Sequence, residues 1–104
     1  MKLDQYTING RINNKIKQSI TIGNLDIVLL DTSGLYPSRE GFKNLLAIDQ
    51  LDHIVWVAEL PVDYLYSSYQ SIELKNEELF ALSGSFLCKV DRETGHILSE
   101  KFVK

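Results

Sequence analysis

The hydrophobic positions of this chain have the pattern of short β-strands from residue 20 onward. Runs rich in Ile, Val, Leu and Phe alternate with Gly, Asn, Asp and Ser. This alternation is typical of strands joined by tight turns. The chain has 104 residues, of which 44% are hydrophobic, so its size and composition fit one compact domain. The sequence therefore predicts a single all-β domain over residues 1–104.

The strand pattern occurs twice. Asp49 in the first copy matches Asp91 in the second, and His53 matches His96 after one added residue. A repeated pattern of this kind indicates two copies of one supersecondary unit, each with four short strands. The matching stretches are ITIGNLDIVLLD at 20–31 with IELKNEELFALS at 72–83, and NLLAIDQLDHIVW at 44–56 with SFLCKVDRETGHILS at 85–99.

Tight turns are predicted within each copy. Gly23-Asn24 and Lys75-Asn76 suit two-residue hairpin turns, because Gly and Asn tolerate positive φ. The stretches QLDH and RETGH join strands three and four, and Gly95 supplies the left-handed position in the second. Four antiparallel strands with short connections form a meander, which is the blade of a β-propeller.

These features predict the order of elements along the chain. The fold class is all-β: two four-stranded antiparallel meander blades, which make half a β-propeller, preceded by a β-ribbon with its turn at Asn9-Gly10. In the first copy, strands two and three are separated by ten extra residues, since the offset between the copies falls from 52 to 42. The predicted segments are the N-terminal ribbon at 1–19, blade 1 at 20–60, a linker at 61–70 and blade 2 at 71–104.

The two copies resemble blades of the pyrroloquinoline-quinone-type β-propeller family. In that family, a strand ending in Ala-x-Asp is followed by a Thr-Gly turn and a strand ending in Trp. The first copy carries Ala47, Asp49 and Trp56, and the second carries Asp91 followed by Thr94-Gly95. The first copy lacks the Thr-Gly pair, and Ser99 stands where the second would have Trp. The resemblance implies blade architecture and carries no quinone cofactor with it.

Two blades are fewer than a closed ring requires. Propellers close with 4–8 blades, so both outer faces of a two-blade unit need a cover, and an uncovered apolar face marks an interaction site. We expect the N-terminal ribbon to cover one of these faces. Trp56 is interpreted as packing between the blades, because a lone aromatic residue at a strand position is usually part of the core.

Charge is unevenly distributed along the chain. Residues 1–44 carry six basic and four acidic side chains, whereas residues 45–100 carry ten acidic and three basic ones. An acidic surface disfavours nucleic acid as a partner, because phosphate neutralisation needs clustered Lys and Arg. It favours a basic protein partner, and a solvated surface that keeps the protein soluble is the alternative interpretation.

Hairpin geometry assigns the loops to two ends. The first end, called the acidic turn end, carries the carboxylates of turns one and three: Asp26, Asp49, Asp52, Glu77, Glu78, Asp91 and Glu93. The second end receives the longer connections, and loops on a rigid scaffold commonly carry function. The alternative is that its aromatic residues fold back over an open blade edge. The candidate partner-binding residues of this tyrosine-rich end are Tyr36, Arg39, Glu40, Phe42, Asp63, Tyr64, Tyr66 and Tyr69.

Enzyme, cofactor and metal motifs are not apparent in the sequence. His53 and His96 fall in equivalent turns, and no zinc-ligand spacing accompanies them. Cys88 is a single cysteine within a strand pattern and is interpreted as a small buried hydrophobe. Neither a phosphate-binding glycine motif nor a GxSxG elbow occurs. We therefore predict a non-enzyme without cofactor or metal. With no signal peptide, no apolar run of membrane-spanning length and no disulfide pair, a cytoplasmic protein is expected.

In size, acidity and scaffold the chain resembles immunity proteins of contact-dependent growth inhibition and related polymorphic toxin systems. This resemblance implies a protein that binds a cognate antibacterial toxin and occludes its active site. The expected toxin is a basic nuclease, such as an RNase, because such surfaces bind phosphate and attract acidic inhibitors. The alternative is a self-assembling module, in which three or four copies close a ring and bind a small ligand in its channel.

Overall fold

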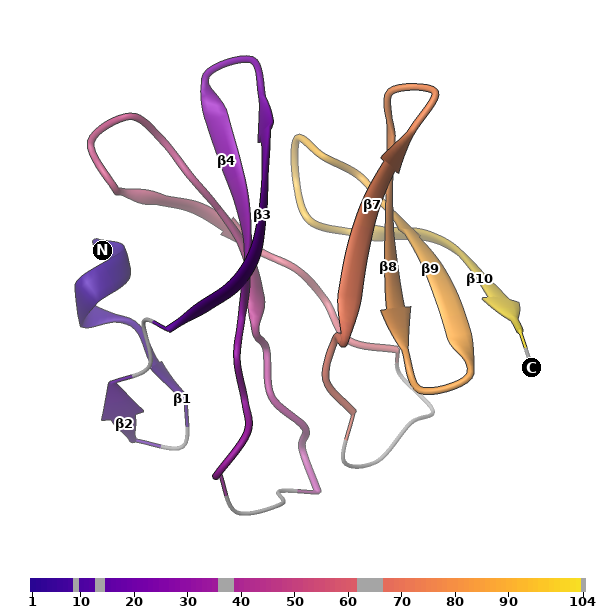
Figure 1. Cartoon of the computed structure of the whole chain (residues 1–104), viewed down its shortest axis with the longest axis horizontal. Helices are drawn as coiled ribbons and strands as arrows, with labels where there is room; N and C mark the ends of the chain where they lie inside the picture. The colour runs from indigo at the N-terminus through magenta and orange to yellow at the C-terminus, as the bar shows by residue number, and fades with distance from the viewer. Residues whose placement is uncertain (9, 13–14, 36–38, 62–66, 104) are drawn as a thin grey trace.

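The computed structural model describes residues 1–8, 10–12, 15–35, 39–61 and 67–103. Strands make up 53% of it, and apart from one 3-10 turn at Leu3–Gln5 the described residues form no helix. Two four-stranded antiparallel sheets stand beside each other, with a small two-stranded ribbon near the N-terminus (Figure 1). The predicted all-β class with two four-stranded antiparallel sheets is confirmed.

Both large sheets are meanders in which strands follow one another in chain order. The predicted start of the first unit at residue 20 is wrong, because the strand begins at Ile16 and pairs along the whole of the next strand, up to Leu30. The first sheet consists of β3 (Ile16–Ile22), β4 (Leu25–Leu30), β5 (Leu45–Ile48) and β6 (Ile54–Val57). The second sheet consists of β7 (Ser71–Lys75), β8 (Glu78–Ser83), β9 (Phe86–Val90) and β10 (Ile97–Phe102).

The first hairpin turn of each sheet has two residues, and positive φ occurs at one of them in the first sheet and at both in the second. In the first sheet the turn is Gly23-Asn24, as predicted, and Gly23 has φ 59°. In the second sheet Lys75 pairs with Glu78, so the turn is Asn76-Glu77, with φ 52° and 64°. The prediction of a Lys75-Asn76 turn is therefore wrong by one residue.

In the third turn of each sheet, an aspartate stabilises the turn through local hydrogen bonds. The backbone N–H of Asp49 donates to the carbonyl of His53, and the N–H of Asp91 donates to that of His96. Each aspartate carboxylate also accepts backbone hydrogen bonds within its own turn, as Asx turns do. The left-handed position is filled by Asp52 in the first turn and, as predicted, by Gly95 in the second. Repeated turn chemistry therefore explains the repeated Asp, whereas His53 and His96 enter these bonds only through their backbone.

The main core lies between the two sheets. Side chains from one face of each sheet interdigitate there, and most are almost fully buried. Burial of apolar area on this scale is the principal force that holds the two sheets together. The core residues are Ile27, Leu29, Leu45, Ala47, Trp56 and Ala58, with Tyr69, Ile72, Leu79, Ala81, Cys88 and Val90.

The side chain of Trp56 contacts the last turn of the second sheet and so links the two sheets. Its side chain is 7% exposed, and its indole Nε1 donates to the carbonyl oxygen of Arg92 at 2.9 Å. The ring lies against Gly95, where an added Cβ would come within 2.7 Å of Trp56 Cε3. Glycine is thus required at position 95 both by its φ of 81° and by the ring beside it. The predicted role of Trp56 in packing between the two units is confirmed.

Two polar side chains also join the sheets. The Gln18 amide bonds both backbone groups of Ile72, accepting from its N–H at 3.0 Å and donating to its carbonyl at 2.6 Å. Glu59, which follows β6, accepts from the N–H of Ile97 at 2.8 Å. The first contact joins the edge strands β3 and β7, so the two sheets form one packed unit.

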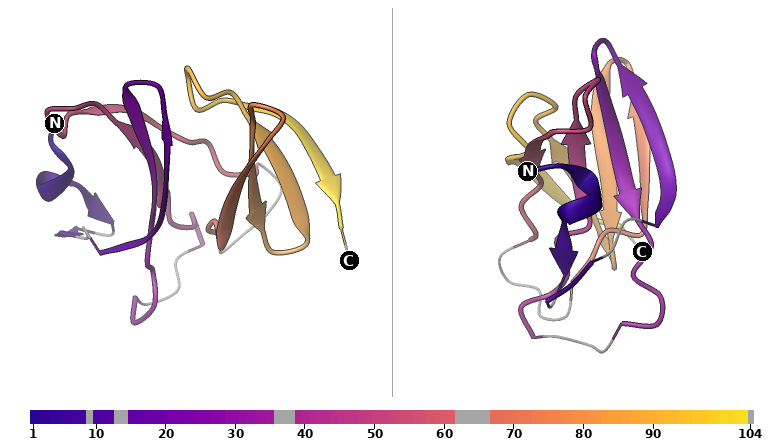
Figure 2. Two further views of the ribbon diagram at one scale, coloured as in Figure 1. Left: turned by 45° about the horizontal axis from the view of Figure 1, so that its top comes forward. Right: turned by 90° about the vertical axis from the view of Figure 1, so that its left-hand side faces the viewer.

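The N-terminal segment covers the opposite face of the first sheet. Leu3 and Tyr6 pack on a second buried cluster formed by β4 and β5, and Ile8 is 5% exposed. The predicted ribbon is present as β1 (Thr7–Ile8) and β2 (Arg11–Ile12). Figure 2 shows this segment on the side of the first sheet that faces away from the second. The expectation that it covers one outer face is confirmed.

Candidate functional site

The tyrosine-rich end is only partly described. Arg39 and Glu40 are exposed there, and their role as contact residues stays a prediction. Phe42 is 8% exposed and Tyr69 2%, so both side chains pack inside the protein instead of facing a partner. The other predicted members of this end, Tyr36, Asp63, Tyr64 and Tyr66, lie outside the described residues.

Tyr69 has a structural role that explains its burial. Its hydroxyl donates to the carbonyl oxygen of Glu59, and its backbone binds the side chain of Asn44. Burial raises the pKa of the Tyr69 phenol well above its ordinary value. Phe42 is held nearby through its N–H, which donates to the carbonyl of Ser67. Tyr69 belongs to the core between the two sheets and does not cover an open blade edge. The prediction of Phe42 and Tyr69 as contact residues is corrected, because both side chains are buried.

The acidic turn end carries hairpin turns from both sheets, which lie in the upper part of Figure 1. Five of its predicted carboxylate residues are exposed, and Asp49 and Asp91 are half-buried. The half-buried pair is committed to turn hydrogen bonds. The carboxylates open to a partner are therefore those of Asp26, Asp52, Glu77, Glu78 and Glu93.

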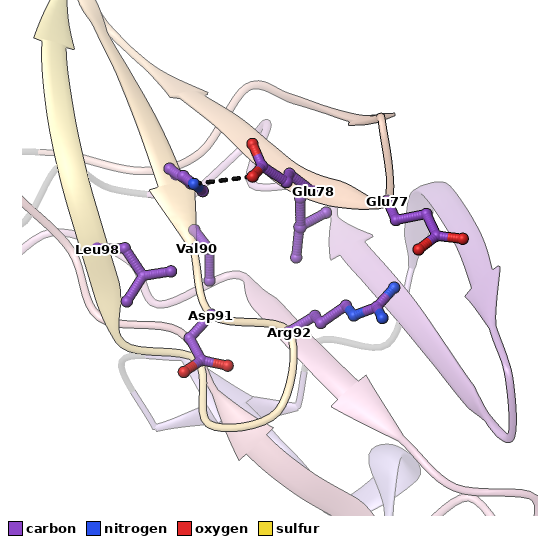
Figure 3. Close-up of a pocket in the computed structure, with 8 residues that line it drawn as sticks. Glu77, Glu78, Val90, Asp91, Arg92 and Leu98 are labelled. Atoms are coloured by element: carbon purple, nitrogen blue, oxygen red, sulfur yellow. Dashed lines mark ion pairs between the residues drawn. The ribbon is translucent and has the colours of Figure 1, made fainter.

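A pocket of about 270 Å³ opens at this end of the second sheet (Figure 3). Its charged rim comes from the β7–β8 turn, from β9 and from the β9–β10 turn. Glu78 and Lys89 form an ion pair across it at 3.0 Å. The rim consists of Glu77, Glu78, Lys89, Asp91 and Arg92, and the apolar lining consists of Leu79, Val90 and Leu98.

The pocket is suited to a long cationic side chain. Leu79 and Val90 are almost fully buried, whereas Leu98 is 57% exposed, so an apolar wall reaches the surface. Lysine and arginine combine an apolar stem with a charged head, and the pocket offers an apolar lining beside the exposed carboxylates of Glu77 and Glu78. Lys89 and Arg92 offset part of this negative charge and would set the orientation of an incoming group.

Acidic pH is expected to weaken the fold through three carboxyl groups. Hydrogen bonds from backbone N–H groups of Ser33, His53 and Ile97 lower the pKa values of Asp31, Asp49 and Glu59, respectively. A folded pKa below the unfolded one stabilises the protein above the unfolded value, and this contribution is lost as pH falls through the folded value. Urea unfolding should therefore give a lower free energy of unfolding at pH 3 than at pH 6, with a smaller difference in Glu59→Gln. Equal stability at the two pH values would contradict this prediction.

The histidines and the cysteine occupy structural positions. His53 Nδ1 lies 3.6 Å from Asp49 and His96 Nδ1 lies 3.5 Å from Glu59, and both histidines are exposed in turns. Cys88 is buried, and burial, aided by the charge of Glu100, raises its pKa to about 11. A reactive cysteine needs the opposite shift. Within the described ranges no group of three or more His, Cys, Asp or Glu side chains could hold a metal ion.

The family described as a domain of unknown function (DUF7957) matches residues 2–102. The chain belongs to this family. No curated protein matches the chain, and no solved structure does. Nor do the described parts of this DUF7957 chain contain a helix of the length and apolar character needed to cross a bilayer. The resemblances to quinone-type propeller blades and to immunity proteins therefore stay predictions.

Sequence reasoning located the acidic end of this DUF7957 domain but missed its pocket. Glu77, Glu78 and Asp91 were predicted at that end, whereas Lys89, Arg92 and Leu98 were not predicted as site residues. Leu98 was missed because a β-bulge between Ile97 and Ser99 interrupts the alternation of side chains between the two faces of β10. Bulges re-aim side chains, and Leu98 between these two residues is exposed beside the pocket.

Proposed function

We propose that this DUF7957 protein is a non-enzymatic immunity protein that binds a cognate antibacterial toxin domain and occludes its active site. The toxin is a basic nuclease, such as an RNase. The observation that supports this function best is the acidic turn end with its open pocket, where an apolar lining lies below Glu77, Glu78 and Asp91. The protein would act in the cytoplasm, where the substrates of such a nuclease are found.

Charge complementarity is the physical basis of the proposal. A nuclease presents Lys and Arg around its active site because it must bind phosphate. A surface of opposite charge raises the rate of association and fixes the orientation of the partners. A lysine or arginine of the toxin would place its stem along Leu98, the exposed part of the apolar lining, and its head among the carboxylates. Occupying that side chain would remove it from the nucleic-acid site.

The acidic turn end fits the role better than the tyrosine-rich end. Two aromatic candidates of the latter, Phe42 and Tyr69, are buried and so cannot contact a partner without a rearrangement. The exposed acidic turns instead stand directly on paired strands. Binding by such a preformed surface avoids much of the entropic cost of ordering a loop.

Under this proposal, a toxin domain is expected to be encoded immediately upstream of this chain's gene, and the test is co-expression with that domain. The wild-type protein should restore growth of cells that express this toxin domain. Glu77→Gln combined with Glu93→Gln should lower the association rate with the purified domain about tenfold at low salt. The matched control is Glu73→Gln with Glu100→Gln, which removes the same charge from exposed positions of β7 and β10 outside both ends and should bind as the wild type does.

Three results would contradict the proposal or its chosen surface. Failure of the wild-type protein to protect cells, or to bind the toxin domain, would contradict the function. Equal losses in the acidic-end pair and in the control pair would show that only overall charge matters. Loss of binding in Tyr64→Ala with Tyr66→Ala, but not in the acidic-end pair, would move the interface to the tyrosine-rich end.

A further inference from the structure

The outer face of the second sheet, which is turned away from the first sheet, carries an apolar strip. Phe80, Leu82 and Leu87 are half-buried there and line a shallow groove of about 280 Å³. Paired residues on neighbouring strands share a face. Along the outer face one row reads Ser71, Leu82, Leu87 and Lys101, and the next reads Glu73, Phe80, Lys89 and Ser99.

The equivalent strip of the first sheet is fully covered. The first turns begin 53 positions apart, at Gly23 and Asn76, so Phe80 and Leu82 correspond to Ile27 and Leu29. Both of these first-sheet residues have no exposed surface, because the second sheet packs on them. The residues of the strip on the second sheet are therefore apolar, like the equivalent residues that are buried in the first sheet.

A ring formed by several copies of this chain would not cover this strip. In a ring, the outer face of the second sheet would pack on the outer face of the first sheet of the next copy. That face is already occupied by Leu3 and Tyr6 of its own N-terminal segment, and Ile8 beside them is 5% exposed. A contact that closes with two copies instead pairs this strip with the same strip of the other copy, which is an isologous contact.

The charges around the strip favour such a contact. Glu73 lies on β7 at one side of the outer face, and Lys101 lies on β10 at the other. A two-fold axis parallel to the strands places β7 of one copy opposite β10 of its partner. The axis keeps each row opposite the same row, so Lys101 faces the partner's Ser71 and the leucines of the two strips meet. Glu73, one row further along β7, then lies diagonally from the partner's Lys101, within the reach of long side chains. We propose that a second copy of this chain covers the outer face of the second sheet in an isologous dimer.

The size of the face sets the expected strength of this dimer. Four strands spaced about 4.8 Å apart and five or six residues long give a face of roughly 19 by 18 Å in projection. Stable interfaces bury about 800 Å² on each partner, so this contact lies at the weak end of the range. The dimer is expected to dissociate at micromolar concentrations and to be detected only above them.

The experiment is sedimentation equilibrium of the purified protein from about 1 to about 500 µM, a range that brackets micromolar dissociation constants. The wild type should change from monomer to dimer across this range. Glu73→Lys and Lys101→Glu should each weaken dimerisation about tenfold or more, because each places like charges within reach of one another. The double variant should recover wild-type dimerisation, since it exchanges the two charges. Both residues are exposed, and unchanged circular dichroism would establish that the variants fold.

Each other outcome overturns the proposal. A monomer at the highest concentration would mean that copies of this chain do not cover the strip, which would leave it to a different protein. A trimer or tetramer would mean a ring with a displaced N-terminal segment. A double variant no better than the single variants would mean that Glu73 and Lys101 do not meet across the interface. None of these results depends on the toxin.

Discussion

Replacing Trp56 with alanine should lower the free energy of unfolding by about 3–5 kcal/mol. Trp56 is, with Glu59, one of the side chains through which the first sheet and the residues after it contact the β9–β10 turn of the second, and its ring is packed on Gly95. Alanine would remove this packing, leave a cavity between the sheets and leave the Arg92 carbonyl without its donor. Few side chains in a domain of this size make contacts of so many kinds at once.

Trp56→Phe separates the two contributions. Phenylalanine keeps an aromatic ring beside Gly95 but cannot donate to the Arg92 carbonyl, so this variant should lose only about 1–2 kcal/mol, close to the value of one hydrogen bond. Urea unfolding followed by circular dichroism measures both variants, because removal of the single tryptophan prevents its use as a fluorescent probe. A loss below about 1 kcal/mol for Trp56→Ala would contradict the role of this residue in joining the sheets.

Replacing Asn44 with alanine should cost about 3 kcal/mol or more. Asn44 is 1% exposed, and its Nδ2 donates to the carbonyls of Leu30 at 3.0 Å and Tyr69 at 2.8 Å. Its Oδ1 accepts from the N–H of Tyr69 at 2.9 Å. Each buried backbone group left without a partner costs about 1–3 kcal/mol. The amide thus joins the end of β4 to the chain that enters the second sheet.

The matched control for Asn44→Ala is Gln50→Ala. Gln50 is an exposed amide whose Nε2 lies 3.4 Å from the side-chain oxygen of Asn24, and surface changes of this kind usually stay within about 0.5 kcal/mol. Urea midpoints of the two variants, measured in the same buffer, give the comparison. Similar midpoints for Asn44→Ala and the wild type would mean that water or a local shift satisfies the freed groups, contrary to our account of this amide.

The repeat could be read from the sequence because its turns have distinctive chemistry. Glycine, asparagine and the Asx-forming aspartates mark where each strand ends, and these positions agree with the structure to within one residue at the first turns. The one-residue error also has a physical cause. Ile20 aligned with Ile72 because both are apolar, and both contribute to the core between the sheets. They do so from opposite faces of equivalent strands, however, and a shift of one residue exchanges the faces of a strand.

The candidate site could be predicted only in part. Hairpin geometry alone places the carboxylates at one end, because the turns of a meander alternate between its ends. Burial of Tyr69 could not be foreseen, since it depends on Asn44 and Glu59, which lie far from it in sequence and come close only in the folded chain. The exposed position of Leu98 depends on a bulge in β10, and no residue type in that strand signals a bulge.

The most direct test of the acidic turn end as the interface is hydrogen exchange of this protein alone and bound to the toxin domain that the proposal expects to be encoded beside it. We expect slower exchange at the β7–β8 turn, residues 76–78, and at the β9–β10 turn, residues 91–96. The connection at residues 39–44, at the opposite end, should exchange equally in both states. Protection confined to residues 39–44 and the neighbouring linker, with none at the two acidic turns, would contradict the account.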